Sequence, residues 1–280
     1  MKVLFHHTVN FPFPLVIVLC FLLFINIAAQ SNPGAREIAL SHSGIATQRN
    51  SFCIFNNPAG LSRSQTRELG LYYSPSPFGL KELANASAAY VEPFSFASFA
   101  VAFTTYGFNL YRENKIAFSA SKSFYNYFYL GITAIYQTLT IKNYGRGNAI
   151  NIILGGQVDL TDKLKLGFAI ENLLRSSYGK EKNQIPVIYK TGLGYYLLKN
   201  LNLNISIEKE LMFPVSVRGG IEYLPVKFIA IRAGVNNYPT SFSGGIGLNY
   251  SFLQVDYSFN ENQNLGFSHQ FGLSIRLNKF

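Results

Sequence analysis

Few side chains of this sequence have the chemistry for catalysis or metal binding. Beyond residue 29 the chain holds two histidines, His42 and His269, and one cysteine, Cys53. No serine and carboxylate pair stands beside either histidine, and two histidines so far apart in sequence are poor candidates for the ligands of a metal ion. We therefore expect both histidines to be structural, with no enzyme activity, catalytic residue, metal or cofactor. Cys53 lies between Phe52 and Ile54, which favours a buried, inert thiol.

Charged residues make up only 14% of the 280 residues, whereas an ordinary soluble domain has about 25%. Many of them alternate with apolar residues, so that in a closed barrel they would point into the lumen. This parity places inward Lys163, Lys165, Lys190, Arg218, Arg232 and Arg276 together with Asp159, Glu171, Glu208, Glu222 and Asp256. The near balance of signs favours internal ion pairs that fix a plug over the one-signed field of a selective pore.

The elements that would position these charges are strands. Leu201, Leu203, Ile205 and Ile207 alternate with polar residues, and this period of two is typical of a strand with two unlike faces. The pattern recurs throughout and predicts fourteen strands, at 67–74, 83–93, 96–106, 113–123, 126–141, 147–159, 163–173, 186–198, 200–210, 214–224, 226–236, 241–251, 253–260 and 264–277. An even number of strands of this length is typical of a bacterial outer-membrane barrel.

A soluble β-sandwich alternates in the same way, and three features favour the membrane barrel. The polar face is rich in glycine, as at Gly131, Gly155 and Gly167, which suits a crowded lumen better than a solvated surface. Charges within strands avoid the apolar face, as lipid contact would require. Tyrosine and phenylalanine gather near segment ends, as in an interfacial girdle. We therefore predict an all-β fold, a transmembrane antiparallel barrel of about 14 strands, with short inner turns and longer outer loops.

The sequence before the barrel of residues 67–280 divides into two segments. Residues 1–29 have the apolar run and the small-residue end of a secretory signal peptide, although an uncleaved anchor is the alternative. Residues 30–66 fit no strand, and 35–47 has weak helical spacing. A fourteen-stranded barrel leaves room inside, so we predict that this segment is a plug; the alternative is an arm that never enters the lumen.

The plug segment contains Asn57-Pro58-Ala59, and the last strand carries a spaced set of residues, Gln270, Gly272, Ile275 and Leu277. In this order of segments the chain resembles outer-membrane barrels of the long-chain fatty-acid transporter superfamily, and most closely the PorV/PorQ-type branch. The resemblance implies that Asn57, Pro58 and Ala59 form a plug motif. It also implies that the last-strand set is a signal for the barrel-assembly machinery.

The same resemblance implies two classes of function. The first, which we expect, is a non-enzymatic accessory role in type IX protein secretion, or in a paralogous process, with secreted cargo domains or a translocon subunit as partners. The other is transport of hydrophobic, fatty-acid-like molecules across the outer membrane, with an apolar ligand held among Phe52, Ile54, Phe55 and aromatic residues of the lumen.

The net charge of +10 is dispersed along the chain, and export makes nucleic acid an unexpected partner. Basic residues of the predicted loops instead suit the anionic headgroups of outer-membrane lipid and lipopolysaccharide, with ordinary solvation as the alternative. These residues are Arg112, Lys142, Arg146, Arg175, Lys180 and Lys182.

Overall fold

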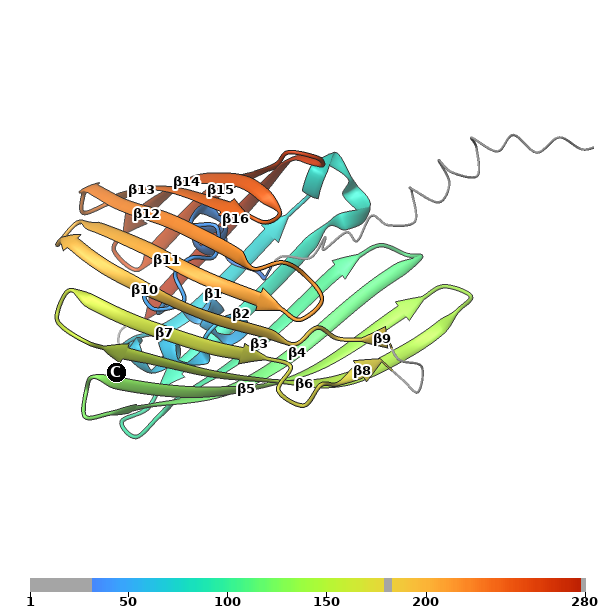
Figure 1. Ribbon diagram of the computed structural model, residues 1–280, viewed down its shortest axis with the longest axis horizontal. Helices are drawn as coiled ribbons and strands as arrows, with labels where there is room; N and C mark the ends of the chain where they lie inside the picture. The colour runs from blue at the N-terminus through green and yellow to red at the C-terminus, as the bar shows by residue number, and fades with distance from the viewer. Residues whose placement is uncertain (1–31, 179–182, 278–280) are drawn as a thin grey trace, which may run out of the picture. The chain divides into compact units, whose positions relative to one another are not determined.

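The chain folds into a closed antiparallel barrel (Figure 1). The computed structural model describes residues 32–178 and 183–277, so the predicted signal peptide lies outside the described residues. The barrel strands are β1 (Arg67–Ser74), β2 (Asn85–Pro93), β3 (Ser98–Gly107), β4 (Tyr111–Phe124), β5 (Phe128–Ile141), β6 (Gly145–Asp159), β7 (Leu164–Glu171), β10 (Ile188–Leu198), β11 (Leu201–Glu210), β12 (Ser216–Val226), β13 (Ile229–Asn237), β14 (Thr240–Tyr250), β15 (Leu253–Asn262) and β16 (Gly266–Leu277). The predicted fourteen-stranded all-β barrel is confirmed, and every strand end lies within three residues of its predicted position.

The ring of strands is closed by pairing of the first strand with the last. Arg67 at the start of β1 lies opposite Leu277 at the end of β16. β7 pairs directly with β10, because the short strands β8 (Ser177–Tyr178) and β9 (Asn183–Gln184) form a separate two-stranded ribbon. We call the end of the barrel with Arg67 and Leu277 the inner end, and the opposite end the outer end.

Side chains along each strand point alternately into the lumen and outward, as the pleat of a strand dictates. On β3, Ala100 and Ala102 are buried, whereas Phe99, Val101 and Phe103 are exposed at 41%, 41% and 46%. Pairing extends this pattern into rows across neighbouring strands. Apolar side chains turned outward over a whole barrel make a lipid-facing surface, so the barrel is a transmembrane one. Within the described residues, no helix is long and apolar enough to cross a membrane.

The turns differ from the expectation at the outer end. Inner-end turns have two to four residues, as predicted, but only the outer connections 75–84 and 172–187 are long. The longer loops expected around residues 106–112 and 143–147 are tight turns, because strand pairing continues nearly to their tips. Phe108 N–H donates to Tyr111 O at 2.8 Å, and Tyr144 N–H donates to Ile141 O at 3.0 Å.

Residues 32–66 lie inside the barrel and fill its lumen, and we call them the plug. The plug contains one α-helix, α2 (Ala35–Ala39), and two 3₁₀ helices, η1 (Ser51–Phe55) and η2 (Pro58–Arg63). α2 packs against β13–β16, and η2 packs against β4–β6. The helix expected over 35–47 is shorter, because Ser41 and His42 adopt positive φ angles of 50° and 57° that end it.

Substitution of Ile132 by arginine tests the lipid-facing assignment. Ile132 lies in the middle of β5, points outward and is 46% exposed. We expect Ile132→Arg to lower the free energy of unfolding in lipid vesicles by about 2–4 kcal/mol, because a cation at mid-membrane loses its hydration. Thr240→Arg, outward at the outer end of β14, should cost at most about 1 kcal/mol. The chain has no tryptophan, so the folded fraction in urea is best followed by gel mobility without heating. Equal losses of unfolding free energy in the two variants would contradict the lipid-facing assignment of Ile132.

Candidate functional site

The plug is fixed to the wall by the turn that contains Asn57. The Asn57 side-chain amide donates to Ile45 O at 2.8 Å and to Gly156 O on β6 at 3.1 Å. Its Oδ1 accepts from the backbone N–H of Ala59 at 3.2 Å, and Pro58 occupies the first turn of η2, where a missing N–H does no harm. Asn57 therefore caps η2, orders the preceding loop and binds the barrel wall at once, which explains the Asn-Pro-Ala sequence in physical terms.

Glycine in the wall lets the plug backbone approach this closely. A Cβ atom on Gly131 would lie 2.4 Å from the Pro58 carbonyl carbon, and one on Gly155 would lie 2.2 Å from Asn57 Oδ1. Both distances are far shorter than van der Waals contact. The glycines on the inward face are thus positions where plug and wall touch, beyond a general shortage of space in the lumen.

A continuous polar network joins two points of the plug across β12, β13, β15, β16 and β1. Arg36 of α2 pairs with Glu222 at 2.8 Å, and Glu222 also binds Arg232 at 3.0 Å. From there the contacts run Arg232–Asp256, Gln254–Asp256, Arg276–Gln254 and Arg276–Glu68, at 2.7, 2.7, 2.6 and 3.1 Å. Glu68 finally accepts the backbone N–H of Ser51, at the start of η1, at 2.8 Å.

Two smaller groups of charges bind the plug elsewhere. Lys190 pairs with Glu171 and lies 3.7 Å from Glu208, which pairs with Arg218 at 2.7 Å. Lys190 also donates to Asn56 Oδ1 at 3.1 Å, so this group includes the plug. In the other group, Asp159 pairs with Arg63 of η2 at 2.7 Å and with Lys165 at 3.1 Å. The Arg63 guanidinium also stacks over the Tyr129 ring.

The structure brings together all but one of the predicted lumen charges. Lys163 is the exception: it lies in the turn between β6 and β7 and is exposed, because β7 begins one residue later than that prediction required. Sequence reasoning missed Arg36, Glu37, Arg63 and Glu68. Glu68 alternates with outward residues of β1 in the same way as Gly70 and Tyr72, so its inward direction could have been predicted from the sequence. The plug residues have no periodicity that reveals their neighbours.

Within the described lumen, the paired charges are balanced. Seven basic side chains (Arg36, Arg63, Lys165, Lys190, Arg218, Arg232 and Arg276) meet seven acidic ones (Glu37, Glu68, Asp159, Glu171, Glu208, Glu222 and Asp256). Such pairs are costly to break, because the remaining partner would be left buried and uncompensated. These pairs tie the plug to the wall and leave no excess of one sign among the paired lumen charges.

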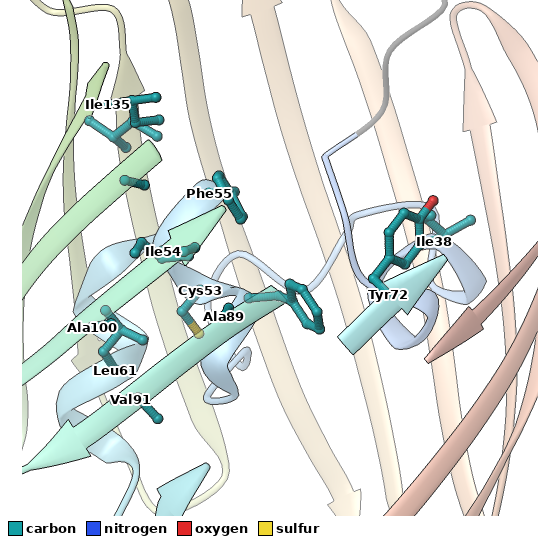
Figure 2. Packing of buried hydrophobic residues seen from close by; sticks show 14 residues of the cluster. Ile38, Cys53, Ile54, Phe55, Leu61, Tyr72, Ala89, Val91, Ala100 and Ile135 are labelled. Carbon is teal, nitrogen blue, oxygen red and sulfur yellow. The ribbon is translucent and has the colours of Figure 1, made fainter. Parts of the chain in front are cut away.

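The opposite side of the plug makes apolar contacts. Its residues Phe52, Cys53, Ile54, Phe55 and Leu61 are at most 4% exposed. They pack on small or apolar inward residues of β1–β6, namely Tyr72, Ala89, Val91, Ala100, Ala102, Ala117, Ile135 and Ile153. Figure 2 shows Cys53, Ile54 and Leu61 beside the strands that carry Ala89, Val91 and Ala100. We call this contact the apolar seam.

The two sides of the plug therefore differ in how they could separate from the wall. Apolar contacts are non-directional and can be replaced by contacts with another apolar group. The charged contacts cannot be broken without leaving buried ions unpaired. Phe52, Ile54 and Phe55, expected to surround a ligand, are packed against the wall.

Other sequence candidates lie apart from one another. The His42 Nε2 atom is buried without a hydrogen-bond partner among the described residues, and burial together with Arg218 and Lys190 holds its pKa well below the usual range. His269 points outward and meets the Tyr257 hydroxyl at 2.8 Å. Burial raises the pKa of the Cys53 thiol well above its usual value, and among the described residues no group of side chains is placed to hold a metal.

The residues of the presumed assembly signal alternate on β16. Gln270 and Gly272 face the lumen, where Gln270 accepts the Ser258 hydroxyl at 3.0 Å. Ile275 and Leu277 point outward near the inner end. The set is thus divided between the lumen-facing side and the outward-facing side of the strand that closes the ring.

Solved structures share this architecture. The monoaromatic hydrocarbon channel CymD superposes with a TM-score of 0.70 at 14% sequence identity, over 89% of this chain and 98% of that one. The toluene transporter TodX of Pseudomonas putida has a TM-score of 0.65 at 13% identity, over 88% and 98%. The chain has the fold of these channels. A Pseudomonas aeruginosa FadL homologue also has a TM-score of 0.65 at 13% identity, over 89% and 99%. No protein-family model matches the sequence, and no curated protein does.

Substitution of Gly131 by alanine tests the close approach of plug and wall. Because its Cβ would overlap the Pro58 backbone, we expect the plug to shift and the free energy of unfolding to fall by about 1–3 kcal/mol. Trypsin should then cut faster after the exposed Arg49 of the plug. Gly219→Ala is the matched control, because its Cβ would make an ordinary contact at 3.5 Å to Val235. Equal cleavage rates in the two variants would argue against the contact.

Substitution of Asp256 by asparagine tests the polar network. Arg232 and Asp256 have side chains 3% and 7% exposed, so loss of the carboxylate should lower the free energy of unfolding by about 3 kcal/mol. Glu92→Gln is the control. Its pair with Arg67 lies on the outward-facing side of the wall, with the Glu92 and Arg67 side chains 20% and 31% exposed. Loss of this pair should lower the free energy of unfolding by less than about 1 kcal/mol. The urea concentration at half unfolding in vesicles measures the stability of both variants. Similar small shifts in the two would contradict a role of the network in fixing the plug to the wall.

Proposed function

We propose that this protein is a non-enzymatic outer-membrane channel for small apolar molecules, and that they pass along the apolar seam. The observation that carries the proposal is the division of the plug into a charged side and an apolar side. A solute that enters between the apolar side chains of η1 and β2–β4 replaces one set of apolar contacts by another, so little free energy is lost. The polar contacts at the edges of the seam, Glu68 with Ser51, Asn57 with Gly156 and Arg63 with Asp159, can then stay in place.

The structural neighbours support this reading. CymD and TodX are described as a monoaromatic hydrocarbon channel and a toluene transporter, and this chain shares their fold. Closed transmembrane β-barrels with an even number of antiparallel strands are typical of the bacterial outer membrane, which supports that location for a chain that begins with a predicted signal peptide. The balanced lumen argues against a charge-selective pore, which would need an excess of one sign.

A role in type IX secretion of the PorV/PorQ kind is the other reading of the sequence. It requires an outer surface able to hold a folded secreted domain. At the outer end only the connections 75–84 and 172–187 exceed five residues, which offers little such surface. We therefore place transport first.

Uptake of labelled toluene tests the channel. Cells that lack their own hydrocarbon channels and express this chain should take up toluene several-fold faster than cells with an empty vector, with arabinose uptake unchanged. Ala102→Leu, which adds volume to the seam at a residue 3% exposed, should reduce the gain. Ala134→Leu, outward on β5, should leave it intact. Equal uptake with and without the chain would refute the proposal, provided that gel mobility shows a folded barrel.

Mass spectrometry of the protein extracted from its native membrane in mild detergent separates the two readings. A stoichiometric apolar molecule would support transport. A co-purifying secreted domain or translocon subunit would instead support the secretion role and assign the lumen charges a purely structural one.

A further inference from the structure

The outward face of β4–β6 changes from apolar to polar and basic near the outer end. Pairing aligns Arg112 on β4 with Thr140 on β5, and Thr140 with Arg146 on β6, in one row. All three residues are exposed and have the outward parity of their strands. Lys142, in the turn after β5, is exposed beside this row. Three basic side chains thus gather at the tip of one three-stranded section of the wall.

The row lies directly beyond the apolar surface. The next row toward the inner end is Asn114, Thr138 and Asn148, and the one after it is Ile116, Tyr136 and Ile150. Beyond that follow Phe118, Ala134 and Ile152, so the surface is apolar from there until the row of Lys122 near the inner end. The polar rows therefore stand at the level where lipid acyl chains end and headgroups begin.

Among the described residues, Arg112, Lys142 and Arg146 form no ion pair, in contrast to the basic residues of the lumen. The nearest acidic residue in sequence, Glu113, points into the barrel and accepts the Tyr111 hydroxyl at 2.5 Å. Glu261, an outward acidic residue near the outer end, is on β15, across the barrel. Within residues 32–178 and 183–277, no carboxylate therefore balances the positive charge of the patch.

We infer that this patch, Arg112, Thr140, Lys142 and Arg146, binds the phosphorylated headgroup of lipopolysaccharide in the outer leaflet; the inference rests on the outer-membrane location proposed above. Strands lie about 4.8 Å apart, so the Arg112 and Arg146 backbones are about 10 Å apart, and two long side chains can converge on one phosphate. Guanidinium groups bind phosphate in a bidentate manner. The Thr140 hydroxyl adds a donor, while acyl chains lie on Ile116, Tyr136 and Ile150.

Binding of lipid A to the purified mature chain in mild detergent tests the inference. By native mass spectrometry, the Arg112→Gln/Arg146→Gln variant should bind diphosphorylated lipid A at least about tenfold more weakly than the unaltered protein, because two charge-assisted contacts are lost. The matched control is Lys199→Gln/Lys227→Gln, which removes two exposed cations from turns at the inner end and should leave binding unchanged. Dephosphorylated lipid A should bind the unaltered protein as weakly as the diphosphorylated form binds the arginine variant.

Equal binding of the two forms of lipid A, or an equal loss in both double variants, would overturn the inference. So would equally tight binding of phosphatidylglycerol, since the patch would then recognise any anionic lipid. Toluene uptake of the arginine variant should match that of the unaltered protein. A failed lipid test therefore leaves the channel proposal standing, and a failed uptake test leaves this one standing.

Discussion

The structure depends on one geometric constraint: fourteen strands enclose more volume than their own inward side chains fill. The inward residues of this barrel are mostly small, such as Ala100, Ala102 and Gly131, and leave that volume to residues 32–66. The plug must then satisfy its backbone groups with only one short α-helix, since the space is short and irregular. It does so with 3₁₀ turns, the Asn57 cap and bonds to the wall, and glycine at the contact points makes those bonds geometrically possible.

Filling the lumen with protein also decides how its charges behave. Ions removed from water are stable only when paired and hydrogen-bonded, and the paired lumen charges meet this demand in equal numbers. The network from Arg36 through Glu222, Arg232 and Asp256 makes one side of the plug costly to displace. On the other side, contacts among Phe52, Leu61 and Ala117 carry no such penalty. This asymmetry is the basis of the proposed selectivity, because an apolar solute can replace the apolar contacts that it displaces.

The outer surface obeys the complementary constraint. Lipid accepts apolar side chains and excludes unpaired charge, so the outward rows of β4–β6 remain apolar until the membrane ends. Where the rows become polar, cations appear without acidic partners, which is the reverse of the lumen. The same residue types thus serve two purposes: in the lumen the protein supplies the counter-charge, and at the rim of the barrel the membrane supplies it.

The sequence by itself determined the strands and the face of each strand that turns inward. A period of two is a local property, and lipid favours apolar side chains at outward positions within the membrane, so Leu203 or Phe271 could be assigned without knowledge of any neighbour. It also determined that Lys165, Glu171 and Asp256 face a common interior. Only the tertiary structure decided the partners of those charges, because Arg36 and Glu222 are far apart in sequence and meet only after the ring closes. The course of the plug was undetermined for the same reason: 3₁₀ turns have no extended periodicity, and their shape is set by the glycine-lined wall against which they pack.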